Sequence, residues 1–166
     1  MLFRSGKIAR VALRVNPDVD AGTHPYISTG LKTNKFGISQ DQATHLALQT
    51  AQLDHVQLVG IASHIGSQIT SVEPYLDALD KVLDLVEANE RRGAKIAHID
   101  LGGGLGIRYT DETPPTPQEW LAPLLAHITA RGFGHRTVMI EPGRSIVGNA
   151  GVLLTRTLFL KSTPAK

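Results

Sequence analysis

The chain of 166 residues contains no cysteine, few aromatic residues and only a small excess of positive charge. The lack of cysteine excludes a disulfide framework and a metal site built from thiolates. The formal net charge of +2 is too small and too dispersed to favour a nucleic acid or a membrane surface as partner. No apolar run reaches the length that a membrane-spanning helix needs. These features favour a cytoplasmic protein that handles a small molecule.

Strand-like apolar runs alternate with amphipathic stretches along the whole sequence. Hydrophobic residues make up 42% and charged residues 19%, which is typical of a globular domain. The apolar runs predict strands, the second of them very short, at 8–15, 36–38, 56–63, 96–101, 137–140 and 152–160.

Capping patterns predict the starts of three helices. Ser39 and Thr70 each precede a Gln or Glu by three residues, which is the spacing of a capping box. Thr116 has the same spacing and is followed by proline, which is favoured at the first helical position. The first helix is predicted to reach about residue 51, and Gly93 and Gly132 are predicted to end the other two, as glycine often does.

Strands separated by helices predict parallel pairing, because the helix is the crossover between neighbouring strands. Such a pattern fits an open doubly wound sheet or a (β/α)8 barrel. A full barrel needs roughly 250 residues, so this chain would hold part of one. No Gly-x-Gly-x-x-Gly follows the first strand, which disfavours a dinucleotide-binding sheet. We therefore predict an α/β fold with a partial (β/α)8 TIM-type barrel.

The residues able to do chemistry follow the predicted strands directly. Arg14 ends the first strand, His64 follows 56–63, the glycine triplet 102–104 follows 96–101, and Glu141 follows 137–140. Sites in α/β folds lie at the C-terminal ends of parallel strands. These positions predict that the clusters share one pocket.

Each cluster can be interpreted either as a structural feature or as part of a binding site. The glycine triplet allows backbone N–H groups to approach a phosphate, but it also suits a tight turn without a ligand. His64 can stack on a flat ring beside the donor Ser67, or it can be a buried histidine bonded to backbone. Glu141 and Arg144 can hold a ring nitrogen and a phosphate or carboxylate, or they can form a surface ion pair at a rigid turn. Together they suit a planar, phosphorylated ring that contains nitrogen.

Four segments resemble the diaminopimelate decarboxylase family, in order and at similar intervals, from about Val11 to the end of the chain. The glycine triplet and Glu-Pro-Gly-Arg are shared with ornithine and arginine decarboxylases, whereas the first segment is more specific to the diaminopimelate branch. The segments are 24–38, 64–68, 100–106 and 141–147.

The resemblance implies a barrel of the alanine-racemase type that binds pyridoxal 5'-phosphate, followed by a β-domain, in a homodimer. His64 would stack on the cofactor, Ser67 and the glycines would hold its phosphate, and Glu141 would keep the pyridine nitrogen protonated. Racemases of this fold present arginine there, so Glu141 favours decarboxylation. Arg144 would bind phosphate or a substrate carboxylate. The implied cofactor-binding residues are His64, Ser67, Gly103, Gly104, Glu141, Pro142, Gly143 and Arg144.

Two parts of the family pattern are missing from the sequence. None of its lysines stands in the context of the family's Schiff-base lysine, and the cysteine-bearing β-domain is absent. The resemblance therefore implies an internal fragment, with residues 1–150 as a partial cofactor-binding barrel and 151–166 as a strand leading toward a truncated β-domain.

The implied function is decarboxylation of meso-diaminopimelate to L-lysine, with the chain as given inactive alone. The substrate would be a small amino acid, and no metal, nucleic acid or membrane is expected to bind. Two alternatives stay open. One is a non-catalytic homologue that binds the cofactor or a partner, and the other is a decarboxylase acting on ornithine- or arginine-type substrates.

Overall fold

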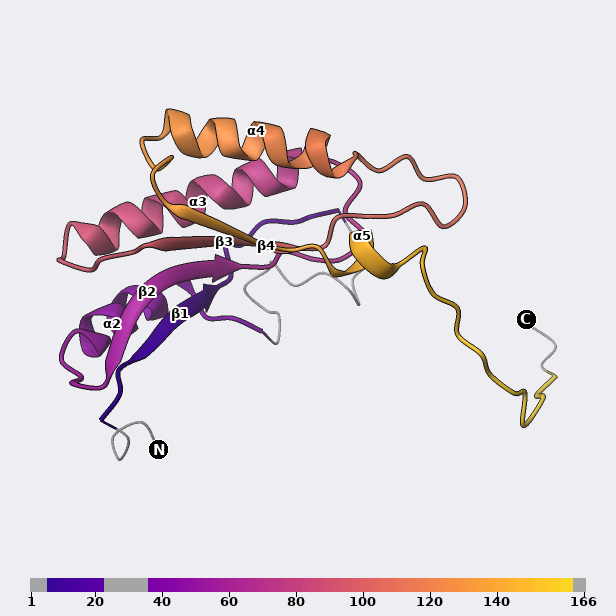
Figure 1. The fold of residues 1–166 in the computed structure, drawn as a ribbon, viewed down its shortest axis with the longest axis horizontal. Helices are drawn as coiled ribbons and strands as arrows, with labels where there is room; N and C mark the ends of the chain where they lie inside the picture. Colours follow the sequence, from indigo (N-terminus) through magenta and orange to yellow (C-terminus); the bar gives the residue numbers. More distant parts are fainter. Residues whose placement is uncertain (1–5, 23–35, 163–166) are drawn as a thin grey trace.

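The computed structural model describes residues 6–22 and 36–162 of the chain (Figure 1). Strands and helices alternate along the sequence, as predicted. The elements are β1 (Ala9–Val15), α2 (Gln40–Thr50), β2 (Val56–Ser63), α3 (Glu73–Glu90), β3 (His98–Gly103), α4 (Pro117–Ala130), β4 (Thr137–Glu141) and α5 (Gly143–Val147).

The strands form one four-stranded sheet in the order β1-β2-β3-β4. Every neighbouring pair is parallel, with Leu13 opposite Ile61, and Ile61 in turn opposite Ile99. Each connection between paired strands contains a helix, because a parallel pair needs a long crossover. The prediction of parallel βα units is confirmed.

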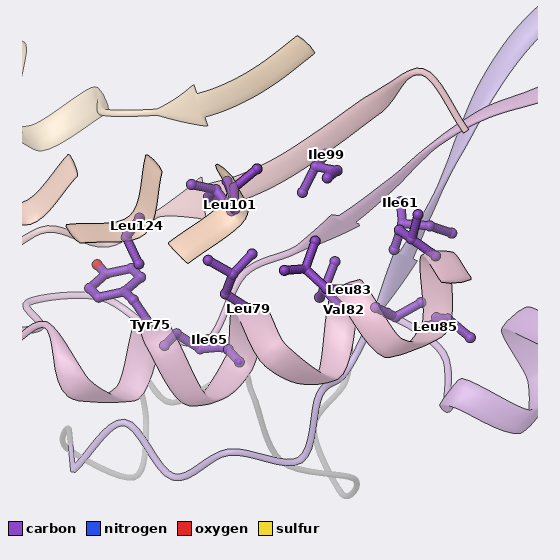
Figure 2. Close-up of a cluster of buried hydrophobic side chains, with 14 of the residues drawn as sticks. Ile61, Ile65, Tyr75, Leu79, Val82, Leu83, Leu85, Ile99, Leu101 and Leu124 are labelled. Carbon is purple, nitrogen blue, oxygen red and sulfur yellow. The ribbon is translucent and has the colours of Figure 1, made fainter. Parts of the chain in front are cut away.

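The hydrophobic core lies between the sheet and the helices. Helix α3 contacts both α2 and α4, so the three helices cover the same side of the sheet (Figure 1). Side chains of α3 such as Leu79, Val82 and Leu83 face Ile61 and Ile99 of the sheet, and all five are buried (Figure 2). The helices thereby fix the positions of the strand ends, where the reactive residues lie.

The opposite side of the sheet, which we call the open face, carries polar residues. On β1 the exposed positions alternate with core-facing ones, so Arg10 and Arg14 lie on the open face. The Arg10 guanidinium lies 3.1 Å from Nε2 of His98 on β3. This face, and the loops at the C-terminal ends of its strands, are available for chemistry.

Two of the three predicted helix caps are confirmed, and the third is wrong. Ser39 and Thr116 both form complete capping boxes. Helix α3 instead begins after Val72, and no side chain caps it. Thr70 is too far from the first turn, because the preceding Ile69 forms a parallel bridge with Leu105 that keeps the segment extended.

The predicted strand at 152–160 is wrong, because residues 151–162 have no regular secondary structure. A strand needs a hydrogen-bonded neighbour, and the described part of the chain offers none to this segment, which extends away from the body in Figure 1. The short strand at 36–38 is reduced to an isolated bridge between Ile38 and Val15. Of the segment 24–38, which carries part of the family resemblance, residues 24–35 lie outside the described part of the chain.

Within 6–22 and 36–162, no helix has both the length and the apolar character required to cross a membrane.

Candidate functional site

The loops after β2, β3 and β4 lie side by side at one edge of the sheet. The strands are parallel, so their C-terminal ends meet there. A backbone N–H of the glycine triplet bonds to His64 from the loop after β2, and Glu141 at the end of β4 lies next to the same imidazole. The structure therefore brings the predicted His64, Gly103 and Glu141 together.

The glycine triplet is packed so closely that side chains are excluded. Gly102 and Gly104 have φ values of +69° and +95°, which L-residues with side chains rarely adopt. A Cβ at Gly104 would collide with the carbonyl oxygen of Gly66, and one at Gly103 would collide with that of Glu141. The end of β3 is thus a bare backbone surface between its two neighbours, a form that suits a phosphate cradle.

His64 is held as a neutral imidazole with a defined tautomer. The N–H of Gly103 donates to Nδ1 over 3.2 Å, so the ring proton is on Nε2. Burial, followed by the positive charge of Arg14, lowers the pKa of His64. Glu141 Oε2 lies 3.7 Å from the same Nδ1, and the charge of this carboxylate acts in the opposite direction by favouring the protonated ring, so it limits how far the pKa of His64 falls. A flat neutral ring and a carboxylate therefore lie side by side.

The triplet is also supported from the helix side. The buried Tyr75 of α3 donates its hydroxyl to the carbonyl of Gly103 over 3.1 Å, and burial raises the pKa of that hydroxyl. The Tyr75 ring packs edge-on against Trp120 of α4, with ring centroids 5.2 Å apart. Gly103 consequently accepts from the core through its oxygen and donates to His64 through its nitrogen.

Gln68 connects the loops, a role that its residue type and its place in the sequence do not predict. Its side-chain amide accepts from the N–H of Ile107 over 3.1 Å and donates to the carbonyl of Ile107 over 2.6 Å. Arg144 donates to the same Oε1 over 3.0 Å, and its guanidinium also lies 5.9 Å from the centre of the Tyr109 ring. In the sequence Gln68 is marked only by its place at the end of the segment 64–68, and no local pattern there identifies such a contact.

The remaining predicted residues lie around this group. Ser67 is half-buried between Gly66 and Gln68 in the loop that faces the triplet. Pro142 precedes the short helix α5, and Gly143 begins it. A Cβ at Gly143 would meet no atom within 4 Å, so packing in the described part of the chain does not require glycine there.

No lysine among the described residues reaches the site. Lys81 lies on α3 and donates to the carbonyl of Asp18 over 2.7 Å. Lys7 and Lys95 precede β1 and β3, at the opposite ends of the strands, and Lys161 lies in the extended segment after α5.

Residues 2–148 match the family described as "Pyridoxal-dependent decarboxylase, pyridoxal binding domain". The chain belongs to this family. The match covers the sheet, the helices on it and every predicted site residue. The predicted resemblance to these decarboxylases is confirmed.

Relatives and solved structures agree with this assignment. The chain is 53% identical to the diaminopimelate decarboxylase of Pseudomonas aeruginosa over 161 residues, which are 97% of this chain and 38% of that protein. It superposes on the Helicobacter pylori diaminopimelate decarboxylase complexed with L-lysine with a TM-score of 0.82 and 36% identity, covering 88% of this chain and 36% of that one. It superposes on the M. jannaschii diaminopimelate decarboxylase in complex with L-lysine with a TM-score of 0.80 and 37% identity, covering 98% of this chain and 39% of that one.

These superpositions confirm the predicted fold class, a partial barrel of the type found in pyridoxal-dependent decarboxylases. The chain spans 38% of the length of the Pseudomonas relative. The family implies pyridoxal phosphate as cofactor, and the residues present fit it. They offer a side-chain-free cradle at Gly102–Gly104, the flat neutral ring of His64 and the carboxylate of Glu141.

Proposed function

We propose that the whole protein containing this chain decarboxylates meso-diaminopimelate to L-lysine. The observation that carries the proposal is the gathering of His64, the glycine triplet and Glu141 at one sheet edge in a chain that belongs to the pyridoxal-dependent decarboxylases. The names of the relatives, which are diaminopimelate decarboxylases at up to 53% identity, favour this substrate over ornithine or arginine. In this proposal residues 1–150 form part of the cofactor-binding barrel, and 151–166 lead toward a C-terminal β-domain.

Each residue of the site has a distinct part in this function. Bound pyridoxal phosphate supplies a ring that takes up the electron pair left when carbon dioxide departs. Glu141 holds a proton at the pyridine nitrogen, and its negative charge keeps that proton in place. His64 would hold the ring by stacking, and the lowered pKa of its imidazole would disfavour a second positive charge beside the protonated pyridine. The backbone of Gly104 would receive the phosphate, while Gly103, whose N–H and carbonyl bond to His64 and Tyr75, would hold the cradle in place.

The other predicted residues complete the binding of charged groups. Ser67 offers a hydroxyl and Gly143 an N–H for the phosphate, with Pro142 fixing the turn between Glu141 and Gly143. Arg144 offers a planar guanidinium that can bind a phosphate or a substrate carboxylate with two parallel hydrogen bonds. Its contact with Gln68 fixes the direction of that group.

The chain as given is proposed to bind the cofactor without catalysing the reaction. The lysine that would carry the cofactor covalently lies outside it, as does the β-domain that would complete the substrate pocket. We further propose that the whole protein is a cytoplasmic homodimer. Sedimentation of the longer protein and fractionation of cells that express it would test these two points.

Titration of the 166-residue chain with pyridoxal phosphate, followed by the absorbance of the cofactor, tests the proposed site. We expect saturable binding, weakened at least about tenfold by Glu141→Gln, because a hydrogen bond to a charged group contributes ~1.5–3 kcal/mol. Glu87→Gln on the exposed surface of α3 is the matched control and should leave the affinity unchanged. Absence of binding, or equal affinity of the Glu141→Gln variant, would reject the site.

Carbon dioxide release from meso-diaminopimelate tests the reaction. The longer protein should turn over this substrate in preference to ornithine and arginine, and the 166-residue chain alone should not. Sustained turnover by the short chain would contradict the placement of the covalent lysine outside it. Preference of the longer protein for ornithine or arginine would replace the proposed substrate.

A further inference from the structure

Gln68 occupies a backbone conformation that its side chain does not favour. Its φ is +60°, and among the described residues only Asp18 shares a positive φ without being glycine. Such conformations cost free energy and persist where surrounding contacts hold them. Gln68 lies directly after Ser67, in the loop whose Gly66 carbonyl abuts Gly104. The strained position therefore lies in the loop that packs against the proposed phosphate cradle.

The side chain of Gln68 pairs with Ile107 as a neighbouring strand would. In an antiparallel hydrogen-bonded pair, two residues exchange an N–H···O bond in each direction. The carboxamide does the same with the backbone of Ile107, over 3.1 Å to its N–H and 2.6 Å to its carbonyl. These two hydrogen bonds hold the chain just beyond the glycine triplet against the loop after β2. A backbone hydrogen bond from the N–H of Ile69 to the carbonyl of Gly104, over 2.9 Å, connects the same two loops beside them.

Gln68 also fixes the loop after β4. Its Oε1 accepts from Arg144 in addition to Ile107, so one atom holds backbone from the loop after β3 and a guanidinium from α5. The Tyr109 ring covers the guanidinium of Arg144 at 5.9 Å. Arg144 is consequently bounded on one side by the amide and on another by the aromatic ring.

We propose that Gln68 is a positioning residue that holds the phosphate-binding loops and Arg144 in register with one another. It does not need to touch the cofactor; it sets the spacing of the groups that do. The inference rests on the proposed function, because it assigns the cradle to the phosphate of pyridoxal phosphate. It goes further in naming a side chain that helps to shape the cradle.

The chemistry of the contacts selects glutamine. Glutamate would accept from Ile107 N–H and Arg144 but would turn a carboxylate oxygen toward the Ile107 carbonyl. Leucine has a similar size and forms none of the three bonds. Asparagine tolerates positive φ and keeps the amide, but it is one methylene too short to reach the same partners.

The test compares the affinities of the 166-residue chain for pyridoxal phosphate and for pyridoxal, which lacks the phosphate. We expect the wild-type chain to prefer the phosphorylated form and Gln68→Leu to reduce that preference about tenfold, as three hydrogen bonds that shape the cradle are lost. Affinity for pyridoxal itself should change by less than about twofold, since His64 and Glu141 remain. A role in stability alone would not lower the preference selectively.

Gln42→Leu is the matched control. Gln42 completes the capping box of α2, so its loss destabilises the chain at a distance from the cradle and should keep the preference for the phosphorylated form. If Gln68→Leu does not fold, Gln68→Asn, which tolerates the positive φ but cannot reach the same partners, is measured in its place, with a reduction of the same order expected. An unchanged preference in the folded Gln68 variant would overturn the positioning role. A wild-type chain that binds both compounds equally would overturn the proposed phosphate cradle itself, and the inference with it.

Discussion

Gly93 and Gly104 have almost the same backbone φ and very different surroundings. Their φ values are +93° and +95°, which any side chain would find strained. Around Gly93, past the end of α3, a Cβ would meet nothing within 4 Å, whereas at Gly104 it would strike the Gly66 carbonyl. At position 93 glycine is required only by the backbone conformation. At position 104 it is required both by the conformation and by the close approach of two loops.

Alanine substitutions at these two glycines distinguish the free-energy cost of the left-handed backbone conformation from the cost of a steric clash. Gly93→Ala should lower the free energy of unfolding by ~1–2 kcal/mol, the cost of a left-handed conformation. Gly104→Ala should cost a further ~1–3 kcal/mol, because the new methyl group must displace the backbone of the loop after β2. Urea unfolding of both variants measures the two losses of unfolding free energy. Equal losses of stability would show that the loops can separate freely at Gly104.

At the scale of single elements, the three long helices begin in different ways. Helices α2 and α4 begin at capping boxes on Ser39 and Thr116, which bond the free N–H groups of the first turn. Helix α3 begins without a side-chain cap, although Thr70 stands at a suitable distance from Glu73 in the sequence. Its start is determined by Pro74 in the first turn and by the extended segment before it.

Substitution of the two threonines tests this difference. Thr116→Ala should lower the free energy of unfolding by ~1 kcal/mol, the usual contribution of an N-terminal cap. Thr70→Ala should change it by less than ~0.5 kcal/mol, because Thr70 is exposed and caps nothing. Thermal or urea unfolding gives both values. A loss at position 70 as large as that at position 116 would mean that Thr70 caps α3 in solution.

The whole molecule has unpaired edges and an exposed apolar segment. Within the described chain, β1 and β4 each pair with another strand on one side only, and the free side of β1 carries no more than the isolated bridge to Ile38. Met139 on β4 is 48% exposed, and the segment after α5 exposes large apolar residues almost fully. They are Val152, Leu153, Leu154, Leu158, Phe159 and Leu160. Unpaired strands and apolar segments of this kind favour self-association.

We therefore expect the isolated chain to associate in a concentration-dependent way. Deletion of residues 151–166 should reduce the associated fraction without abolishing it, because the edges of β1 and β4 remain. The double variant Leu153→Gln, Leu154→Gln should have an intermediate effect at the original length. Light scattering during size-exclusion chromatography measures each species. A chain that stays monomeric with the segment present would contradict the prediction.

The sequence by itself determined the alternation of strands and helices, two of the three caps and the strand ends at which the reactive residues lie. These features depend on neighbours close in the chain: apolar periodicity, cap spacing and glycine at helix ends. It could not determine where α3 begins or whether 152–160 forms a strand, because each depends on a partner segment far away in sequence.

Only the tertiary structure decided how the reactive residues are held. The tautomer of His64 follows from the N–H of Gly103, a residue 39 positions away, and Gln68 reaches equally far to Ile107 and farther still to Arg144. Such contacts depend on loops that parallel strands bring to one edge, and no local pattern encodes their distances. The residue types indicated the cofactor chemistry, whereas the packing of three loops determined the shape of the site.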